Sequence, residues 1–174
     1  MSNPFFKFCP RCGSPMSIQH HGGMDRQACT NIPACGFVHW DNPVPVVAAI
    51  VEHDGDIILA RNVLWPGKFF ALITGYLEKN DPSPEIGVAR EVKEELNLDA
   101  QAVTFVGHYP FPRQNQLIIA YHVVATGEIK LNEELAEYQR VPPAQAKYWP
   151  AATGLALRDW LISRGHDPQA MAFS

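Results

Sequence analysis

The sequence predicts an α+β protein in which a small cysteine-rich unit precedes a larger domain of strands and helices. All four cysteines lie before residue 36. Apolar, β-rich runs alternate with turn residues from residue 44 onward. Two later segments, 84–96 and 151–165, repeat apolar residues at helical spacing.

The composition is that of a globular protein. Hydrophobic residues make up 47% of the 174 residues, enough for one ordinary domain and a small addition. The longest clearly apolar run, 44–51, is far shorter than the about 20 residues that a membrane helix needs. The N-terminus lacks a basic segment followed by an apolar stretch, so we expect a cytoplasmic protein that is not secreted.

The charge balance argues against an extended nucleic-acid surface. The chain has 14 basic and 18 acidic residues, which gives a formal net charge of −4. An anionic substrate is still compatible with this balance, because bound divalent cations can supply positive charge.

The cysteines form two pairs, Cys9 with Cys12 and Cys29 with Cys35. Disulfides are rare in the cytoplasm, so clustered thiols there favour metal binding. Four thiolates can close a tetrahedron around Zn²⁺. The first pair has the spacing of a zinc knuckle, and the second resembles the longer knuckle of topoisomerase-type zinc ribbons. The alternative is a set of ordinary reduced cysteines.

Three histidines, His20, His21 and His39, accompany the cysteines. Any of them could replace one ligand, but four cysteines suffice, so we expect these histidines at the surface. Residues 1–40 then form a ribbon that is too small to be stable without its metal. Residues 41–166 form the second domain, and 167–174 form a tail.

The second domain begins after a junction that carries two prolines. Residues 46–53 and 56–63 are predicted strands, and Asp54-Gly55 between them is a strong hairpin signal. Further apolar, β-rich runs follow at 69–77, 103–111 and 116–127.

The first helix has clear start signals. Ser83 is a good N-cap, Pro84 suits the first helical position, and Glu85 is favourable at the positive helix end. Its apolar stripe recurs every four residues, at Val88, Val92 and Leu96. The second helix is expected to stop at Gly165. Its apolar side consists of Leu155, Leu157, Trp160, Leu161 and Ile162.

Three carboxylates, Glu91, Glu94 and Glu95, crowd the first helix, and we place them opposite its apolar stripe. Carboxylates three or four residues apart on a helix repel each other. One interpretation is a solvated face on which Arg90 pairs with Glu94. The other is a site for a hard divalent cation, which prefers carboxylate oxygens.

The residues around this helix resemble the Nudix box, whose pattern is Gly-x5-Glu-x7-Arg-Glu-apolar-x-Glu-Glu-x-Gly-apolar. In the segment 75–98, residues 90–95 match its core and Leu98 fills the last apolar place. Asp81 stands where the box has its first glutamate, the loop after it is one residue longer, and Asn97 replaces the second glycine. The last exchange is mild, because Asn often adopts the left-handed conformation at a helix end.

The resemblance implies a Nudix fold, a mixed β-sheet sandwiched between helices, and a catalytic Mg²⁺ or Mn²⁺. Glu91 and Glu95 would be the principal metal ligands, with Glu94 as a further ligand or as a base through water. Arg90 would orient Glu91. The resemblance favours the cation site over the solvated face.

Two further contributions are implied by the same resemblance. The backbone carbonyl of Thr74 would be another metal ligand, and Gly75 would let the loop approach the metal. A general base often lies on a later loop, and Glu134, within 132–137, is our choice for base and metal ligand. The alternative is that the glutamates of this segment merely line a polar loop.

A zinc ribbon before this box is similar to the bacterial NADH pyrophosphatase group of the family. That group carries a Ser-Gln-Pro-Trp-Pro-Phe-Pro signature after the box, and residues 109–112, Tyr-Pro-Phe-Pro, imitate its second half. Tyr109 and Phe111 would stack on a base, as would Trp40 at the ribbon junction. Core packing is the alternative for all three aromatic residues.

The resemblance thus implies hydrolysis of the pyrophosphate bond in a nucleoside diphosphate derivative, with NADH or NAD giving AMP and a mononucleotide. ADP-ribose and FAD are alternative substrates. We expect a small-molecule nucleotide partner, no membrane, no extended nucleic acid, and a homodimer. A nucleotide-sensing or nucleic-acid-binding protein without turnover is the rival interpretation, and zinc that serves dimer formation only is a third.

Overall fold

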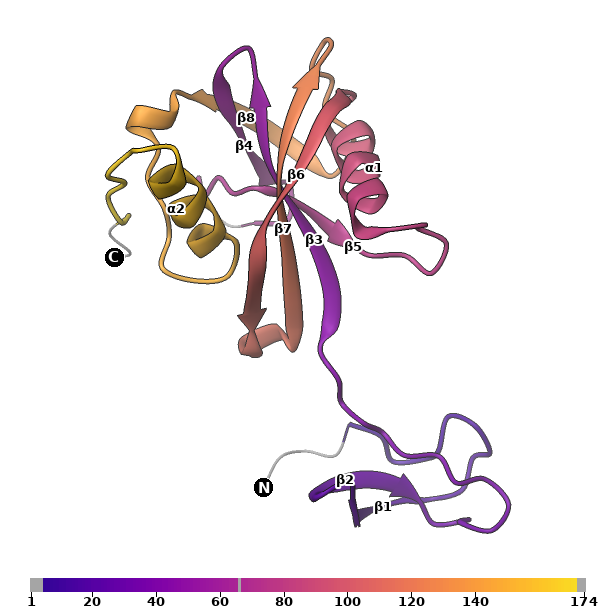
Figure 1. Cartoon of the computed structure of the whole chain (residues 1–174). Helices are drawn as coiled ribbons and strands as arrows, with labels where there is room; N and C mark the ends of the chain where they lie inside the picture. Colours follow the sequence, from indigo (N-terminus) through magenta and orange to yellow (C-terminus); the bar gives the residue numbers. More distant parts are fainter. Residues whose placement is uncertain (1–4, 66, 172–174) are drawn as a thin grey trace. The chain divides into compact units, whose positions relative to one another are not determined.

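The structure is a computed structural model that describes residues 5–65 and 67–171. The chain divides into two compact units, Met1–Asn42 and Pro43–Ser174, just beyond the boundary that we expected (Figure 1). Among the described residues, no helix combines the length and the apolar character needed to cross a membrane.

The first unit is built on an antiparallel hairpin. Strands β1 (Met16–His21) and β2 (Met24–Cys29) pair along their full length. The turn between them uses Gly22 and Gly23, whose φ angles of 59° and 79° suit glycine. The hairpin ends at Cys29, so one predicted metal ligand is the last residue of β2.

The described residues of the second unit form a mixed six-stranded sheet and two α-helices. The strand order is β6-β7-β3-β4-β8, with β5 also paired to β3. The central β3 runs parallel to β7 and antiparallel to β4 and β5. The strands are β3 (Val44–His53), β4 (Asp56–Asn62), β5 (Ile73–Tyr76), β6 (Asp99–Phe111), β7 (Gln116–Thr126) and β8 (Leu135–Val141). The helices are α1 (Pro84–Leu96) and α2 (Thr153–Ser163), with short 3₁₀ turns η1 (Pro112–Gln114) and η2 (Pro143–Gln145).

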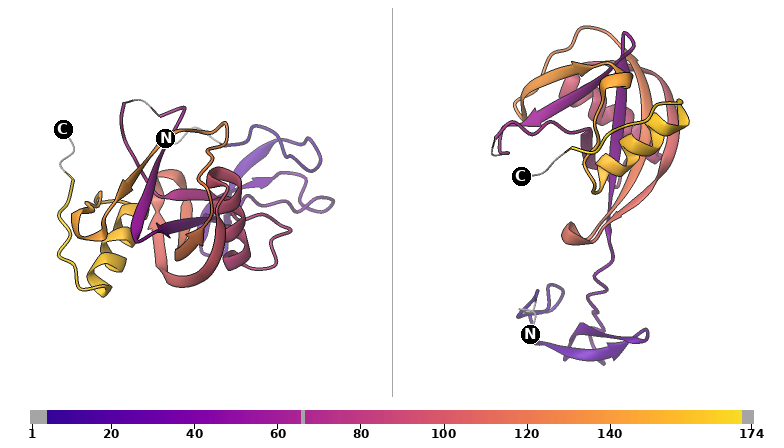
Figure 2. Two further views of the ribbon diagram at one scale, coloured as in Figure 1. Left: turned by 90° about the horizontal axis from the view of Figure 1, so that it is seen from above. Right: turned by 90° about the vertical axis from the view of Figure 1, so that its left-hand side faces the viewer.

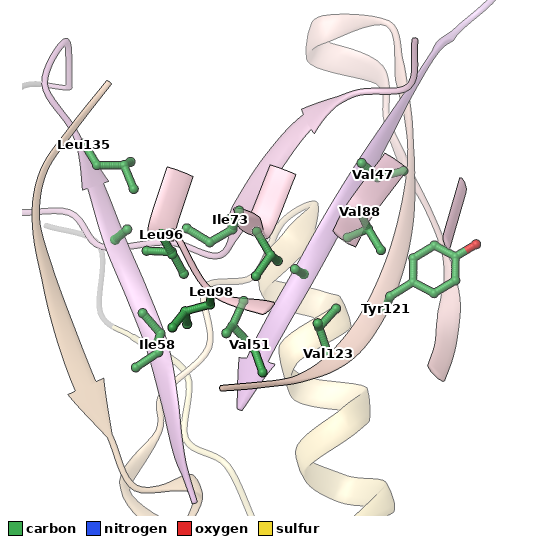
Figure 3. Packing of buried hydrophobic residues seen from close by; sticks show 14 residues of the cluster. Val47, Val51, Ile58, Ile73, Val88, Leu96, Leu98, Tyr121, Val123 and Leu135 are labelled. Atoms are coloured by element: carbon green, nitrogen blue, oxygen red, sulfur yellow. The ribbon is translucent and has the colours of Figure 1, made fainter. Parts of the chain in front are cut away.

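The two helices cover opposite faces of the sheet (Figures 1 and 2). Alternate residues of a strand point to opposite faces. In β3, Val47 and Val51 pack with the α1 stripe, whereas Ile50 packs with the α2 side. Figure 3 shows the α1 side, where side chains from five strands meet the helix. The predicted fold, a mixed sheet between helices, is therefore confirmed.

The local signals for the hairpin and the first helix are confirmed. Asp54 and Gly55 have φ angles of 53° and 84°, as a two-residue hairpin turn requires. The hydroxyl of Ser83 accepts a hydrogen bond from the backbone N–H of Ile86 at 3.4 Å, and Pro84 opens the helix. Asn97 ends the helix with a φ of 61°.

The strand predictions need correction at two places. Of the run 69–77, only β5 forms a strand, because Ala71 makes just an isolated bridge to Ala60. Strand β8 was missed, and its polar sequence explains why. Its edge position leaves four of its seven side chains exposed, so it lacks a strong apolar pattern.

The C-terminal helix forms as predicted, but its apolar side differs. Leu157, Trp160 and Leu161 are buried, whereas Ile162 is 55% exposed and the small Ala156 takes a core position. Beyond the helix, the backbone of Tyr148 bonds to Gln169 and Met171. Part of the segment expected to be a tail therefore pairs with the domain.

Candidate active site

A pocket of about 810 Å³ brings together the box residues and several aromatic side chains of the second unit. Part of its lining comes from β5 and the loop after it, from α1 and from the segment before β8, namely Thr74, Gly75, Tyr76, Glu78, Arg90, Glu91, Glu94, Glu95 and Glu134. Its remaining polar residues come from η1 (Arg113, Gln114) and from the first residues of β7 (Gln116) and α2 (Thr153). Its other aromatic residues are Trp65, Phe69, Phe111 and Trp149. The volume is sufficient for a nucleotide-sized ligand.

The three box glutamates of α1, Glu91, Glu94 and Glu95, do not share one exposed face. Glu91 and Glu95 are 9% and 7% exposed, and they flank the apolar stripe instead of lying opposite it. Glu94 alone is exposed. The difference arises because β5 and the segment before β8 cover this side of the helix. Carboxylates at this depth need compensation, which a solvated face would not require.

Arg90 connects three acidic residues of the box, Asp81, Glu91 and Glu94. Its Nη1 donates to Glu91 at 2.8 Å and to Glu94 at 3.0 Å. Its Nε and Nη2 donate to the two carboxylate oxygens of Asp81 at 3.2 Å and 3.1 Å. These partners, with the hydrogen bond to Asp81 foremost, raise the pKa of Arg90 above its ordinary value. The guanidinium thus fixes the orientation of Glu91 and has little freedom of its own.

Asp81 serves this network from the position of the first glutamate of the box. The hydrogen bonds from Arg90, followed by the backbone N–H of Glu78, lower the pKa of Asp81. The space beside it is tight, because a Cβ on Gly87 would lie 2.9 Å from Asp81 Oδ2. Asp81 is shorter than the glutamate of the box and is followed by a longer loop, yet it reaches Arg90. This departure from the box therefore preserves an ion pair with Arg90.

Gly75 makes room for the Glu91 carboxylate. A Cβ built on Gly75 would lie 1.8 Å from the Glu91 carboxyl carbon and 2.0 Å from its Oε1. No side chain can occupy that place while Glu91 keeps its position. The residue before it, Thr74, belongs to β5 and lines the same pocket.

Glu95 has no basic partner among the described residues. Burial, and then the charges of Glu91, Glu134 and Glu94, raise its pKa to about 8. Burial also raises the pKa of Glu91, although Arg90 acts against this. A group of hard oxygen donors with uncompensated charge fits Mg²⁺ or Mn²⁺, both of which prefer carboxylate oxygens.

The structure brings Glu134 to the same pocket as the α1 acids. It lies directly before β8, and its backbone carbonyl accepts a hydrogen bond from the N–H of Val63 at 2.8 Å. Its charge contributes to the raised pKa of Glu95, and both residues line the pocket. Its role as base or metal ligand stays a prediction.

The two aromatic residues of the Tyr-Pro-Phe-Pro segment have different surroundings. Phe111 lines the pocket at the end of β6. Tyr109 is not among the lining residues, and its hydroxyl donates to Asp159 of α2 at 3.0 Å. Both rings pack against the cluster that contains Ala156 of α2. Asp159 of helix α2 thus holds the Tyr109 hydroxyl, and a role of Tyr109 in substrate binding stays a prediction.

Trp40 belongs to the first unit. The guanidinium of Arg26 lies 4.9 Å from the centre of its ring, and a Cβ on Gly22 would be 3.1 Å from the ring. These contacts support packing on the ribbon, and a role in substrate binding stays a prediction.

Sequence reasoning missed several pocket residues. Phe69 and Trp149 meet edge to face with ring centres 5.4 Å apart, and Trp65 lies 5.8 Å from Phe69. Arg113, from η1, adds a positive charge to the lining. The aromatic residues resemble core residues in the sequence, and only the clustering of three aromatics within 65–70 could have drawn attention to them.

The four cysteines form a cluster that could hold a metal ion. Their sulfur atoms all lie within 4.8 Å of one another. Cys9 Sγ is 3.7 Å from Cys35 Sγ, and Cys12 Sγ is 3.5 Å from Cys29 Sγ. Zn–S bonds of about 2.3 Å give tetrahedron edges of about 3.8 Å, whereas a disulfide is about 2.05 Å long. The distances therefore favour a metal over disulfides.

The thiols differ in acidity. Hydrogen bonds from Ser14 lower the pKa of Cys12 to about 6. Burial raises the pKa of Cys29 to about 12 and also raises that of Cys35. A bound cation would hold all four as thiolates and would displace the remaining protons.

Comparison with known proteins identifies the second unit. A model of the NUDIX domain family matches residues 41–161. The crystal structure of a NUDIX hydrolase from Nitrosomonas europaea superposes with a TM-score of 0.76 at 22% identity, covering 96% of this chain and 97% of that one. The solution structure of the E. coli ORF135 protein has a TM-score of 0.58 at 24% identity and covers 71% of this chain and 91% of that one. These structural similarities show the fold.

Similar curated proteins carry the name NAD-capped RNA hydrolase NudC. The protein of Stutzerimonas stutzeri is 31% identical over 135 residues, which are 77% of this chain and 47% of that protein. The protein of Mycobacterium tuberculosis is 35% identical over 95 residues, which are 53% of this chain and 29% of that protein. The chain thus spans about half the length of these relatives or less.

Proposed function

Because this chain belongs to the Nudix domain family, we propose that it hydrolyses the pyrophosphate bond of a nucleoside diphosphate linked to another moiety. The preferred substrate class is NADH- or NAD-type dinucleotides, which would give AMP and a mononucleotide. The observation that carries this proposal is the group of buried box carboxylates within a pocket of about 810 Å³.

The box residues would hold Mg²⁺ or Mn²⁺. The ligands would be Glu91 and Glu95, with Glu94, Glu134 and the carbonyl of Thr74 completing the set. Such an ion, when bound, neutralises phosphate charge and makes a coordinated water more acidic. Arg90 holds Glu91 in place, and Gly75 leaves room for its carboxylate. The buried charge that is unfavourable in the free protein thereby becomes the source of cation affinity.

Glu134 is the proposed base for the attacking water. It lines the pocket with the α1 acids but comes from a separate segment, so it can face substrate from another side than the helix. As an exposed carboxylate it can accept a proton and return it to solvent. Glu94, an exposed acid of the pocket that belongs to the box core, is the alternative base.

The aromatic lining supports a substrate with a flat base. Phe111 lies at the end of β6, and Arg113 follows it in η1. A base can stack on an aromatic ring while a cationic side chain attracts phosphate. The names of the NudC relatives support NAD-type substrates, including the NAD cap of an RNA. The net charge of −4 supports recognition of the cap alone, without extended RNA contacts.

The cysteine cluster is proposed to hold structural Zn²⁺. The first unit has few large buried side chains, so closure by a metal would contribute much of its stability. A homodimer in the cytoplasm stays our prediction from the sequence.

The substitution Glu95→Gln tests the proposed activity. The wild-type protein with Mg²⁺ or Mn²⁺ should release AMP from NADH, and the variant should lose about 10²- to 10³-fold in rate, since a catalytic metal contributes several kcal/mol. Mass spectrometry of products from NADH, NAD⁺, NAD-capped RNA, ADP-ribose and FAD identifies the preferred substrate.

A matched control is Glu133→Gln, which removes a carboxylate outside the pocket lining and should leave the rate unchanged. Circular dichroism melts of both variants check folding. A wild-type protein that binds these nucleotides but releases no product would contradict the proposal and favour a nucleotide sensor.

A further inference from the structure

The segment 127–134, which joins β7 to β8 and ends at Glu134, is attached to the C-terminal end of α1. The N–H of Lys130 donates to the carbonyl of Leu96 at 3.0 Å, and the N–H of Asn132 donates to the carbonyl of Glu95 at 3.3 Å. The last carbonyls of a helix lack partners within the helix. The segment therefore uses acceptors that the helix itself leaves open.

Asn97 adds a third link, which depends on its side chain. Its backbone is left-handed, and its N–H caps the helix by donating to the carbonyl of Lys93 at 3.0 Å. Its Nδ2 donates to the carbonyl of Glu128 at 3.1 Å. The box has glycine at this place, and glycine would provide the same cap without this donor. The exchange that looks mild from the sequence thus adds a contact between distant segments.

The rest of the segment is held at both ends. Nε2 of the buried His53 donates to the carbonyl of Gly127 at 2.9 Å. At the other end, the side-chain oxygen of Asn132 accepts from the N–H of Glu134 at 3.0 Å. Between these points Ile129 and Leu131 pack against the core that contains α1. The chain leading to Glu134 is therefore docked on the helix that carries Glu91 and Glu95.

We propose that Asn97 is a positioning residue that, through the carbonyl of Glu128, fixes segment 127–134 and with it the place of Glu134 relative to Glu95. This inference rests on the proposed function for its catalytic consequence. The physical basis is that a metal ligand or base acts only within a narrow range of positions, and a 1 Å displacement can cost about 10²-fold in rate. Asn97 itself contacts neither the pocket nor the reacting atoms.

Asn97→Gly is the decisive substitution, because it keeps the left-handed cap and removes only the donor. We expect the amides of Lys130 and Asn132 to exchange hydrogen roughly 5-fold faster, as the loss of one hydrogen bond implies. The Mn²⁺ dissociation constant, measured by electron paramagnetic resonance, should rise by a similar factor of about 5. Both measurements are independent of turnover.

The matched control is Lys93→Gln at the same helix end. It removes the contacts of the Lys93 ammonium with Asp99 and with the carbonyl of Asn97, but touches nothing in segment 127–134. Its amide exchange in the segment and its Mn²⁺ affinity should equal those of the wild type. Asn97→Asp, which keeps the shape but not the donor, should behave like Asn97→Gly.

Kinetics separate positioning from general stability. With saturating Mg²⁺, Asn97→Gly should lower kcat about 10-fold, within the range that misplacement allows, and leave KM nearly unchanged. In a Glu134→Gln background, Asn97→Gly should have no further effect on kcat or on Mn²⁺ affinity. If Asn97→Gly lowered kcat by the same factor again in that background, Asn97 would not act through Glu134.

The remaining outcomes are also decisive. If the amides of segment 127–134 exchange no faster in Asn97→Gly, the hydrogen bond from Asn97 to Glu128 does not constrain the segment. Faster exchange with unchanged Mn²⁺ affinity and unchanged kcat would overturn positioning. If the wild-type protein hydrolyses no nucleotide, the proposed function is wrong. Amide hydrogen exchange and Mn²⁺ affinity would then still test whether Asn97 positions the segment.

Discussion

At the residue scale, the site depends on where a few charges are held. Arg90 contacts Asp81, Glu91 and Glu94, whereas Glu95 has no cation partner in the described part of the chain. Its raised pKa, about 8, reflects burial first and neighbouring carboxylates second. The uncompensated negative charge therefore lies at Glu95, where a bound divalent cation would neutralise it.

Substitution of Gly75 by alanine should disrupt this arrangement. The added Cβ would coincide with the Glu91 carboxylate, so either the side chain or β5 must move. We expect Mg²⁺ affinity and kcat each to fall by about 10-fold or more, as for displaced metal ligands. Isothermal titration with Mg²⁺ and steady-state rates measure the effect.

The corresponding control is Ala89→Gly on α1, which removes a side chain that does not line the pocket. It should lower the melting temperature through helix propensity but leave Mg²⁺ affinity intact. Unaltered Mg²⁺ binding by Gly75→Ala would show that Glu91 is not a ligand at its present position.

At the element scale, short local signals define most of the framework. The Asp54-Gly55 turn, the Ser83 cap and the stripe on α1 each form as their sequence predicts. Each of them depends on neighbouring residues only. The cysteine ribbon follows the same logic, because two knuckles and one hairpin bring four sulfur atoms within 4.8 Å of one another.

Cys12→Ser should unfold the first unit selectively. The loss of one thiolate leaves three ligands, and a small unit without its metal has too little core to remain folded. We expect zinc content to fall from about one ion per chain to near zero. Limited proteolysis should then cut within residues 5–42 while residues 43–171 stay resistant.

Ser17→Ala, on β1 and outside the cysteine cluster, is the control and should retain zinc. Wild-type protein treated with a chelator should reproduce the behaviour of Cys12→Ser. Resistance of the metal-free first unit to protease would argue for ordinary reduced cysteines.

At the scale of the whole second unit, the pocket exists only because distant segments converge. Its lining combines box residues with Phe111 from β6, Trp149 from the segment before α2, and Glu134 from the approach to β8. The mixed sheet, with β3 parallel to β7 and antiparallel to β4, is what places these segments together. Phe111 and Tyr109 show the consequence, because Phe111 lines the pocket whereas the Tyr109 hydroxyl bonds to Asp159 of α2.

Phe111→Ala should weaken substrate binding more than it slows the chemical step. Stacking of a base on an aromatic ring contributes about 1–3 kcal/mol, so KM for NADH should rise about 10-fold while kcat changes little. Steady-state kinetics on the purified variant provide the measurement.

Tyr109→Phe keeps the ring and removes only the hydrogen bond to Asp159, so its KM should match the wild type. An increase in KM for Tyr109→Phe equal to that of Phe111→Ala would mean that the Tyr109 hydroxyl or its bond to Asp159 contributes to substrate binding.

The sequence alone determined the α+β class, the cysteine pairs, the capped acidic helix and the family resemblance, because these depend on residue types at short spacings. Only the tertiary structure decided that Glu91 and Glu95 are buried, that Asp81 holds Arg90, and that Asn97 reaches Glu128. It also revealed β8 and separated Phe111 from Tyr109. These features arise from contacts between segments far apart in the chain, and burial or a hydrogen bond of that kind has no local sequence pattern.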